Sequence, residues 1–276
     1  MKRNLIFIYF LVVSAVLLAQ DKNFHIYLCL GQSNMEGNAP IEPQDTCNIN
    51  DRFLVMSGVD CPDLGRVKGN WYKAVPPLVR CHTGLTPADY FGRTLLEYLP
   101  LEVKVGVINV SVGGCSIDLF DKEHYKEYVA GAPDWLKNSV REYGDNPYGR
   151  LVELARSAQK QGVIKGVLLH QGETNTGDRT WPEKVKKVYE NLLRDLELTP
   201  ELVPLIAGET VHADQKGRCA SMNEIIDMLP QVIPTAQVVS SAGCPAADDH
   251  LHFTAEGYRI LGKRYATRML EAMGPR

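Results

Sequence analysis

The sequence predicts an α/β protein whose mostly parallel β-sheet is covered by helices on both faces. Short apolar runs rich in β-branched residues alternate along the chain with longer amphipathic segments, as in folds built from β-α-β units. Several short runs are apolar at consecutive positions, which indicates strands buried on both faces of a parallel sheet. The expected strands are Phe24 to Leu30, Phe53 to Met56, Val103 to Val110, Val163 to His170, Val203 to Ala207 and Gln237 to Ser240.

The sequence predicts four helices, three between these strands and one after the last strand. One follows Thr86, which has a first-turn proline and an acidic third position, and one follows Thr180, which has capping-box spacing to Glu183. The other two are the stretch YGRLVELARSAQKQG, with apolar residues at Leu151, Leu154, Ala155 and Ala158 and a stop at Gly162, and Ala255 to Ala272, opened by Thr254.

Two segments interrupt the alternation, Glu36 to Tyr72 and Asp118 to Asn146. Long irregular insertions of this kind are expected either to be surface loops that shape a site or to be poorly ordered. The sequence contains no internal repeat, low-complexity tract or interdomain linker. Residues 21–276 are therefore expected to form one catalytic domain.

The N-terminus predicts a secretory signal over residues 1–20. A basic pair, Lys2-Arg3, precedes an apolar run from Leu5 to Ala19, and cleavage is expected after Ala19 or Gln20. An uncleaved anchor is the alternative, although the run is short for a spanning helix. The expected location is outside the cell or in the periplasm.

Cysteine content and net charge limit the ligands that the chain is expected to bind. Seven cysteines cannot all pair within one chain, and the pairing stays open, although Cys29 lies in an apolar run and is expected to be a free core thiol. No CxxC spacing suggests a metal site. A net charge of −3 provides no basic field for nucleic acid or an anionic membrane, so a neutral or weakly charged substrate is expected.

Residues whose side chains or backbone could take part in catalysis follow four of the expected strands. In an open parallel sheet, ligands bind beyond the carboxyl ends of the strands, so these residues are expected to meet. They are Gly31-Gln32-Ser33-Asn34, Gly113-Gly114 within SVGGCS, the HQGETN stretch from His170 to Asn175, and Asp248, Asp249, His250 and His252 after the last strand.

These groups match the needs of acyl transfer. A serine hydroxyl becomes nucleophilic when an imidazole takes its proton, and a carboxylate can orient that imidazole. The developing oxyanion needs N–H donors, which Ser33 and Gly114 could provide from the backbone and Gln171 from its side chain.

The four blocks GQSNM, GGxS, HQGExN and DxxH resemble those of the SGNH hydrolase superfamily, and more narrowly of its carbohydrate esterase family 6 and sialate O-acetylesterase-like branch. The resemblance implies a three-layer α/β/α sandwich with a five-stranded, mostly parallel sheet and no cofactor or metal. It makes Ser33 the nucleophile, His252 the base, Asp249 the orienting carboxylate, and Gly114 and Gln171 members of the oxyanion hole with Ser33.

Several of these residues have alternative roles. Ser33 could be only a helix N-cap, and Asp248 and His250 compete for the acid-base roles. His170 is expected to be a hydrogen-bonded core histidine, and Glu173 either holds its loop or contacts substrate, with the structural role favoured. A zinc site would have to use Asp248, Asp249, His250 and His252, but no HExxH motif is present.

The expected function is a secreted O-acetylesterase that acts on an acetylated oligo- or polysaccharide such as acetylxylan, with no nucleic acid partner and no membrane partner after signal cleavage. The main rival substrate is O-acetylated sialic acid, whose carboxylate could be met by Arg80, Arg93 or Arg179. An inactive carbohydrate-binding relative is the non-enzyme alternative. Aromatic residues of the two irregular segments suit the faces of a sugar chain: Trp71, Tyr72, Tyr125, Tyr128 and Trp135.

Overall fold

The computed structural model describes residues 20–274, and within them seven strands form one sheet in the order β3-β2-β4-β1-β5-β6-β7. All neighbouring pairs are parallel except β2 and β3, which are antiparallel. The strands are β1 (Asp21–Gly31), β2 (Phe53–Met56), β3 (Trp71–Lys73), β4 (Lys104–Ser111), β5 (Gly162–His170), β6 (Leu205–Gly208) and β7 (Gln237–Val239).

The α/β class is confirmed, but the expected number of five strands is wrong, since the described sheet has seven. All six strands expected from the apolar runs are present. β3 was missed because it is only three residues long and begins within the last two residues of the segment Glu36 to Tyr72, which was expected to be irregular. It joins the sheet at one edge by pairing with β2, and β7 extends the opposite edge.

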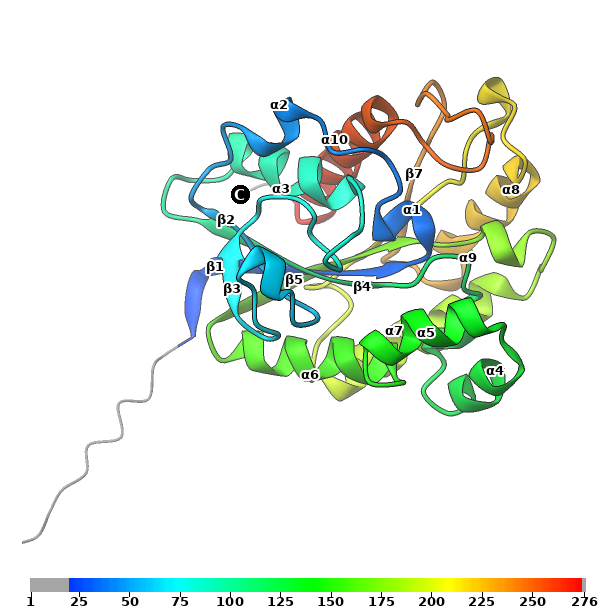
Figure 1. Cartoon of the computed structure of the whole chain (residues 1–276), viewed down its shortest axis with the longest axis horizontal. Helices are drawn as coiled ribbons and strands as arrows, with labels where there is room; N and C mark the ends of the chain where they lie inside the picture. The colour runs from blue at the N-terminus through cyan, green and yellow to red at the C-terminus, as the bar shows by residue number, and fades with distance from the viewer. Residues whose placement is uncertain (1–19, 275–276) are drawn as a thin grey trace, which may run out of the picture.

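Helices cover both faces of the sheet. Figure 1 shows α3 and α10 on one side and α5, α6 and α7 on the other. The helices of residues 20–274 are α1 (Ser33–Glu36), α2 (Pro43–Thr46), α3 (Pro87–Tyr98), α4 (Tyr125–Gly131), α5 (Asp134–Glu142), α6 (Pro147–Gln159), α7 (Trp181–Asp195), α8 (Asn223–Ile226), α9 (Leu229–Val232) and α10 (Ala255–Ala272), with 3-10 turns η1 (Pro62–Leu64), η2 (Ile117–Phe120), η3 (Glu173–Asn175), η4 (Ala213–Gln215) and η5 (Ala220–Met222).

Alternate side chains of the central strand β1 enter two different cores. Ile26 and Leu28 pack in the core that contains the apolar faces of α5, α6 and α7. Tyr27 and Cys29 pack on the other face with residues of α3 and α10. This alternation produces the three-layer arrangement, since each strand residue points to the face opposite its neighbour.

All four helices expected from the sequence are present, but not all of their predicted start and stop signals are used. Thr86 caps α3 in a complete capping box, and α10 has the expected bounds. The hydroxyl of Thr180 instead donates to Asp178, so the predicted capping box of α7 does not form. The α6 helix ends at Gln159, and Gly162 opens β5 rather than stopping the helix.

The segment from Asp118 to Asn146 is largely helical, which corrects the expected irregular loop. Its α5 helix buries Leu136 and Val140, which lie four residues apart on one face and enter the core. This spacing was visible in the sequence but was masked by the surrounding charged and aromatic residues.

The predicted signal over residues 1–20 lies outside the described residues except for Gln20. Within residues 20–274, none of the helices is both long enough and apolar enough to cross a bilayer. Cys61 and Cys81 form a disulfide, and Cys29 is a buried free thiol, as predicted.

Candidate active site

Three central strands end at the same level of the sheet. Gly31 at the end of β1 is in register with Ser111 of β4 and with His170 of β5. A methyl group added to Gly31 would lie 2.1 Å from the carbonyl oxygen of His170, so only glycine permits this close approach. The residues that follow the three strands therefore emerge side by side.

Ser33, His252 and Asp249 form one hydrogen-bonded chain at the carboxyl ends of these strands. Ser33 is the first residue of α1, directly after β1, and the other two lie between β7 and α10, a segment that reaches the same end of the sheet as α1 (Figure 1). Ser33 Oγ lies 2.9 Å from His252 Nε2, and His252 Nδ1 lies 2.6 Å from Asp249 Oδ2. The structure thus brings together the three residues that the sequence singled out.

The carboxylate of Asp249 is held as an anion. Its second oxygen, Oδ1, accepts the backbone N–H groups of Leu251 and His252 at 2.9 and 3.0 Å. Partial burial acts to raise the pKa of Asp249, but these hydrogen bonds and the contact with the His252 ring outweigh it and lower the pKa to about 2. Asp249 can therefore orient the imidazole and stabilise its charged form at neutral pH.

The backbone N–H groups of Ser33 and Gly114 are the predicted oxyanion donors. Neither the N–H of Ser33 nor that of Gly114 has an acceptor within residues 20–274. Gly114 has a φ of +69°, a left-handed conformation that glycine adopts without strain. Gly113 is different, because its N–H donates to Glu36 Oε1 at 3.1 Å and fixes the turn.

The side-chain amide of Gln171, predicted as an oxyanion donor, has its hydrogen-bond partners within the protein. Its side chain is only 1% exposed, and Nε2 lies 3.0 Å from Gln32 Oε1, 3.1 Å from the Cys115 carbonyl oxygen and 2.8 Å from Asn175 Oδ1. Two amide hydrogens face three acceptors, so none is left for a ligand. The indole N–H of Trp181 fixes the opposite end of the amide, and Gln171 acts as an internal brace.

Asn34 ties the nucleophile helix to the loop that carries His252. Its Nδ2 donates to the Leu251 carbonyl at 3.0 Å, and its Oδ1 accepts the Phe253 N–H at 3.4 Å, so it bonds the residues on both sides of His252. It also bonds the hydroxyl of Tyr258 in α10 at 2.7 Å. The sequence suggested a local brace for Asn34, whereas these contacts span more than 200 residues of chain.

Glu173 and His170 form a second carboxylate–histidine pair, buried behind Ser33. Glu173 Oε1 accepts from Asn34 Nδ2 and lies 3.7 Å from His170 Nε2. Burial raises the pKa of Glu173, although the Asn34 contact opposes the rise, and burial lowers the pKa of His170 to about 3. His170 is the hydrogen-bonded core histidine expected from the sequence, with its Nδ1 3.1 Å from the Tyr265 hydroxyl.

Arg80 connects three parts of the site from behind. Arg80 is 5% exposed, and its guanidinium forms ion pairs with Glu36 of α1 and Glu142 of α5. Since Glu36 also accepts the Gly113 N–H, one chain of contacts links α5, the nucleophile helix and the glycine turn. No local sequence pattern predicts this link. Because both ion pairs engage the guanidinium, Arg80 is no longer a candidate for binding a substrate carboxylate.

The competing residues are directed elsewhere. His250 Nδ1 lies 3.1 Å from the Gln215 carbonyl oxygen, and Asp248 is exposed. Both ring nitrogens of His252 are already occupied by Ser33 and Asp249, so the alternative zinc cluster of residues 248–252 does not form.

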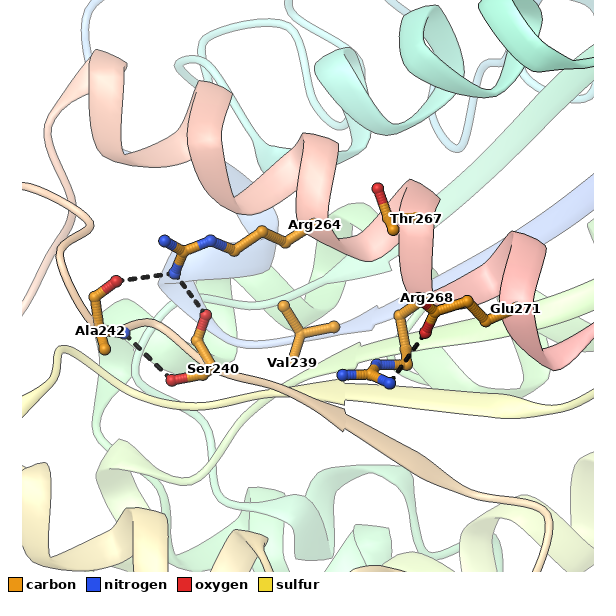
Figure 2. Close-up of a pocket in the computed structure, with 7 residues that line it drawn as sticks. All are labelled: Val239, Ser240, Ala242, Arg264, Thr267, Arg268 and Glu271. Carbon is orange, nitrogen blue, oxygen red and sulfur yellow. Dashed lines mark hydrogen bonds and ion pairs between the residues drawn. The ribbon is translucent and has the colours of Figure 1, made fainter.

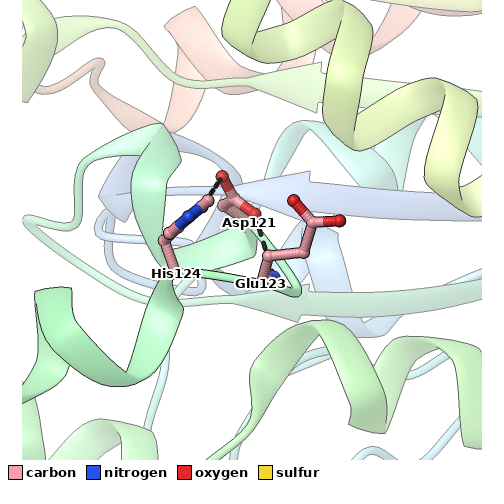
Figure 3. A group of neighbouring side chains, drawn as sticks. All are labelled: Asp121, Glu123 and His124. Carbon is pink, nitrogen blue, oxygen red and sulfur yellow. Dashed lines mark hydrogen bonds and ion pairs between the residues drawn. The ribbon is translucent and has the colours of Figure 1, made fainter.

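Among residues 20–274, one group of metal-ligating side chains does converge, namely Asp121, Glu123 and His124 at the end of η2 (Figure 3). Lys187 Nζ lies 2.9 Å from Asp121 and 2.8 Å from Glu123, and His124 lies 3.0 Å from Asp121. The lysine balances the acidic charge, so this group is an ion-pair cluster.

A hollow of about 340 Å³ lies between β7 and α10, away from Ser33, His252 and Asp249, none of which lines it (Figure 2). Arg264 donates to the carbonyl oxygens of Ser240 and Ala242 at 2.8 Å each, and Arg268 pairs with Glu271. Its cationic side chains are therefore occupied within the protein.

Known proteins resemble this chain in sequence and in fold. A family model described as carbohydrate esterase, sialic acid-specific acetylesterase matches residues 23–271. Similar folds include a protein from Arabidopsis thaliana (TM-score 0.67, 23% identity, 91% of this chain and 99% of that one) and NanS (0.61, 16%, 92% and 98%). A carbohydrate acetylesterase from Xanthomonas citri has a TM-score of 0.59 at 20% identity over 87% of this chain and 55% of that one.

Proposed function

Because the chain belongs to the sialic acid-specific acetylesterase family of carbohydrate esterases, we propose that it removes O-acetyl groups from a sugar by a serine mechanism. The observation that carries the proposal is the unbroken chain Ser33–His252–Asp249 beside the unpaired N–H groups of Ser33 and Gly114. These are the groups that acyl transfer requires: a nucleophile, a base, an orienting carboxylate and oxyanion donors.

The reaction proceeds through an acetyl-enzyme. Ser33 Oγ attacks the acetyl carbonyl carbon while its proton passes to His252 Nε2, and the N–H groups of Ser33 and Gly114 stabilise the oxyanion. The tetrahedral intermediate collapses as His252 returns the proton to the sugar oxygen, which leaves as an alcohol. Water, activated by the same imidazole, then releases acetate and restores the serine.

The substrate is a neutral acetylated oligo- or polysaccharide such as acetylxylan. Recognition of a sialic acid would be aided by a free cation beside the nucleophile, but Arg80 is enclosed by two glutamates. Arg93 donates to the carbonyl oxygens of Asp45 and Cys47. Of the three candidate arginines, Arg179 alone has no protein acceptor within residues 20–274, and it is exposed on the turn before α7.

Acetate release from acetylated xylan and from O-acetylated sialic acid, measured side by side, tests the substrate. We expect the higher kcat/KM on the xylan. A clear preference for the sialic acid would favour the second candidate, which is supported by the description of the matching family.

The acyl group is proposed to be short. The kcat/KM values for p-nitrophenyl acetate, butyrate and octanoate should fall in that order. A pocket for longer acyl chains would have the opposite effect, because each methylene buried in it would add about 0.8 kcal/mol of favourable binding. A rise from acetate to octanoate would instead indicate a lipid or long-chain ester substrate.

Export through the segment 1–20 is part of the proposal, since polysaccharides lie outside the cell. N-terminal sequencing of the protein recovered from the culture medium or periplasm should give a start at Gln20 or Asp21. A protein that starts at Met1 and stays with the membrane fraction would indicate the uncleaved anchor.

A further inference from the structure

Trp135 is a large aromatic side chain that the fold leaves open beside the nucleophile. Its residue is 56% exposed at the start of α5, although the next residue, Leu136, is fully in the core. A methyl group added to Gly114 would lie 2.6 Å from the Trp135 ring, so the indole covers this glycine. A methyl group on the preceding Gly113 would lie 3.7 Å from Ser33 Cβ, which places the indole one residue away from the reacting centre.

The structure distinguishes Trp135 from the other aromatic residues that the sequence suggested for sugar binding. Those four are engaged or lie elsewhere: the Trp71 ring packs 4.9 Å from Phe24, the Tyr72 hydroxyl accepts the Val67 N–H, the Tyr128 hydroxyl accepts the Ser116 N–H, and Tyr125 lines a separate hollow with Lys137 and Asp145.

The position of Trp135 relative to Ser33 is fixed by buried contacts. α5 is anchored to the core by Leu136 and Val140, and Glu142 at its end pairs with Arg80. Arg80 also pairs with Glu36 in the same helix as Ser33. An aromatic surface held rigidly at the mouth of a site can bind a flat ligand without first losing side-chain freedom.

We propose that Trp135 is the platform on which the sugar ring carrying the acetyl group stacks. Pyranose rings have an apolar C–H face that matches an indole in size, and their hydroxyl groups stay at the rim in contact with water. The exposed Thr174, whose hydroxyl donates to the Gly114 carbonyl oxygen at 3.1 Å, lies at the same rim. This inference rests on the proposed function, and it assigns the choice of a sugar over a simple ester to one residue.

Kinetics with two substrates test the platform. For each variant, kcat/KM is measured on an acetylated xylooligosaccharide and on ethyl acetate, which has no ring to stack. In Trp135→Ala the ratio of the two values should fall about tenfold, mainly through KM, and Trp135→Phe should restore most of it. Tyr98→Ala is the matched control, since Tyr98 is 68% exposed but lies before β4, at the end of the strands opposite to Ser33. An unchanged ratio in Trp135→Ala would overturn the proposal.

A binding measurement separates failure of the platform from failure of the proposed function. In a Ser33→Ala background the xylooligosaccharide should change the tryptophan fluorescence, and this change should be lost in Ser33→Ala/Trp135→Phe. A wild-type enzyme that releases no acetate from sugars would reject the proposed function alone. Fluorescence that changes equally in both variants would reject the platform alone.

The amides around Ser33 carry a second, independent inference about the oxyanion site. Gln32 Oε1 is held by Gln171 Nε2 at 3.0 Å and by the Thr174 N–H at 3.3 Å. Thr174 of the η3 turn also donates to the Gly114 carbonyl oxygen, so the turn that holds this carboxamide is bonded to the glycine turn, and Gln32 directly precedes Ser33. Its Nε2 has no acceptor within residues 20–274 and, unlike His170 Nε2, is not sealed from solvent.

The geometry points to Gln32 Nε2 as the side-chain donor to the oxyanion, in the role that the sequence assigned to Gln171. Gln171 is then a positioning residue, because it holds the oxygen of Gln32 inward. On ethyl acetate, Gln32→Ala should lower kcat by about 10²–10³-fold with little change in KM, as removal of a transition-state donor does.

Gln171→Met provides the comparison, because it leaves the Gln32 amide in place and removes only one of its supports. Its loss in kcat should be at least tenfold smaller than that of Gln32→Ala. The reverse order, or a kcat within threefold of wild type in Gln32→Ala, would overturn the inference. Ser33→Ala in the same assay tests the serine mechanism separately.

Discussion

Two carboxylate–histidine pairs lie at the same strand ends, and their environments give them opposite properties. Asp249 and His252 are in contact at 2.6 Å at the rim, where hydrogen bonds lower the pKa of Asp249 to about 2. Glu173 and His170 lie 3.7 Å apart behind Ser33, where burial raises the pKa of the glutamate and lowers that of the histidine to about 3. The outer pair is suited to proton transfer, and the inner histidine is neutral at neutral pH.

The difference shows how consecutive residues can serve different ends. Ser33 bonds the outer pair and Asn34 bonds the inner one, although they are neighbours in α1. Asn34 also bonds the backbone on both sides of His252, so the inner layer sets the position of the outer one. Changes in the outer layer should therefore affect rate, and changes in the inner layer should affect stability first.

The largest expected effect is on rate, in the outer layer. Ser33→Ala or His252→Ala should lower kcat by about 10⁴–10⁶-fold, because the two side chains act as one unit in forming the acetyl-enzyme. The melting temperature should stay within a few degrees of wild type. His250→Asn is the control, since its ring faces Gln215 and asparagine tolerates the positive φ of this position. Full activity in Ser33→Ala would rule out the serine mechanism.

A smaller loss is expected when the orienting carboxylate becomes an amide. Asp249→Asn should lower kcat less than either change above, because the serine and imidazole remain. We expect its loss to be smaller by about one to two orders of magnitude. Since its pKa is lowered to about 2, Asp249 stays ionised over the acid limb of the kcat/KM profile, which then reports another group. Asp248→Asn, one residue away and exposed, should match wild type. Equal losses in the two variants would contradict this assignment.

In the inner layer, the largest effect is expected from Asn34. Asn34→Ala removes four hydrogen bonds, three of them buried, and leaves Glu173 without its donor, so the free energy of unfolding should drop by about 2–4 kcal/mol. Urea unfolding measures the change, and Asn23→Ala, at the exposed start of β1, should stay within about 0.5 kcal/mol of wild type. Unchanged stability with a large loss of kcat would move Asn34 into the outer layer.

The smallest effect is a change in the pH dependence of stability. Burial raises the pKa of Glu173 above its ordinary value of 4.5, so the folded state binds its proton more tightly than the unfolded state. The bound proton therefore stabilises the folded state at low pH. This stabilisation is lost as the pH rises from 4.5 through the raised pKa of Glu173, because the deprotonated carboxylate is then a buried charge. Glu173→Gln should therefore gain stability relative to wild type as the pH rises above 4.5.

Urea unfolding at several pH values measures this gain, and the exposed Glu190→Gln provides a control with the same change in charge. A difference from wild type that is constant with pH, or that is greater at low pH, would show that Glu173 stays ionised in the folded protein.

The sequence was sufficient where the signal was local. The apolar runs located six strands, and the threonine and proline at the start of α3 located that helix. Ser33, Asp249 and His252 were chosen because each follows a strand or lies in a three-residue spacing, and the structure joins them by hydrogen bonds.

The rest depends on contacts between distant residues. Arg80 meets Glu36 and Glu142 at separations of 44 and 62 residues, and no local pattern announces such a meeting. The direction in which a side-chain amide points also depends on distant residues. Gln171 and Gln32 have the same side chain and differ only in the groups that the fold places around them. Trp135 could be proposed with four other aromatic residues, but only the folded chain shows that it covers Gly114.

The two edges of the described sheet are short, since β3 and β7 have three residues each. An unpaired edge strand presents free N–H and C=O groups to which a strand of another molecule can bond, and this is a common route to aggregation. Here the long strands β1, β4 and β5 lie in the middle, where both neighbours are already paired. A second molecule that approaches either edge meets a ladder of at most three residues, so edge-to-edge growth into fibrils is disfavoured.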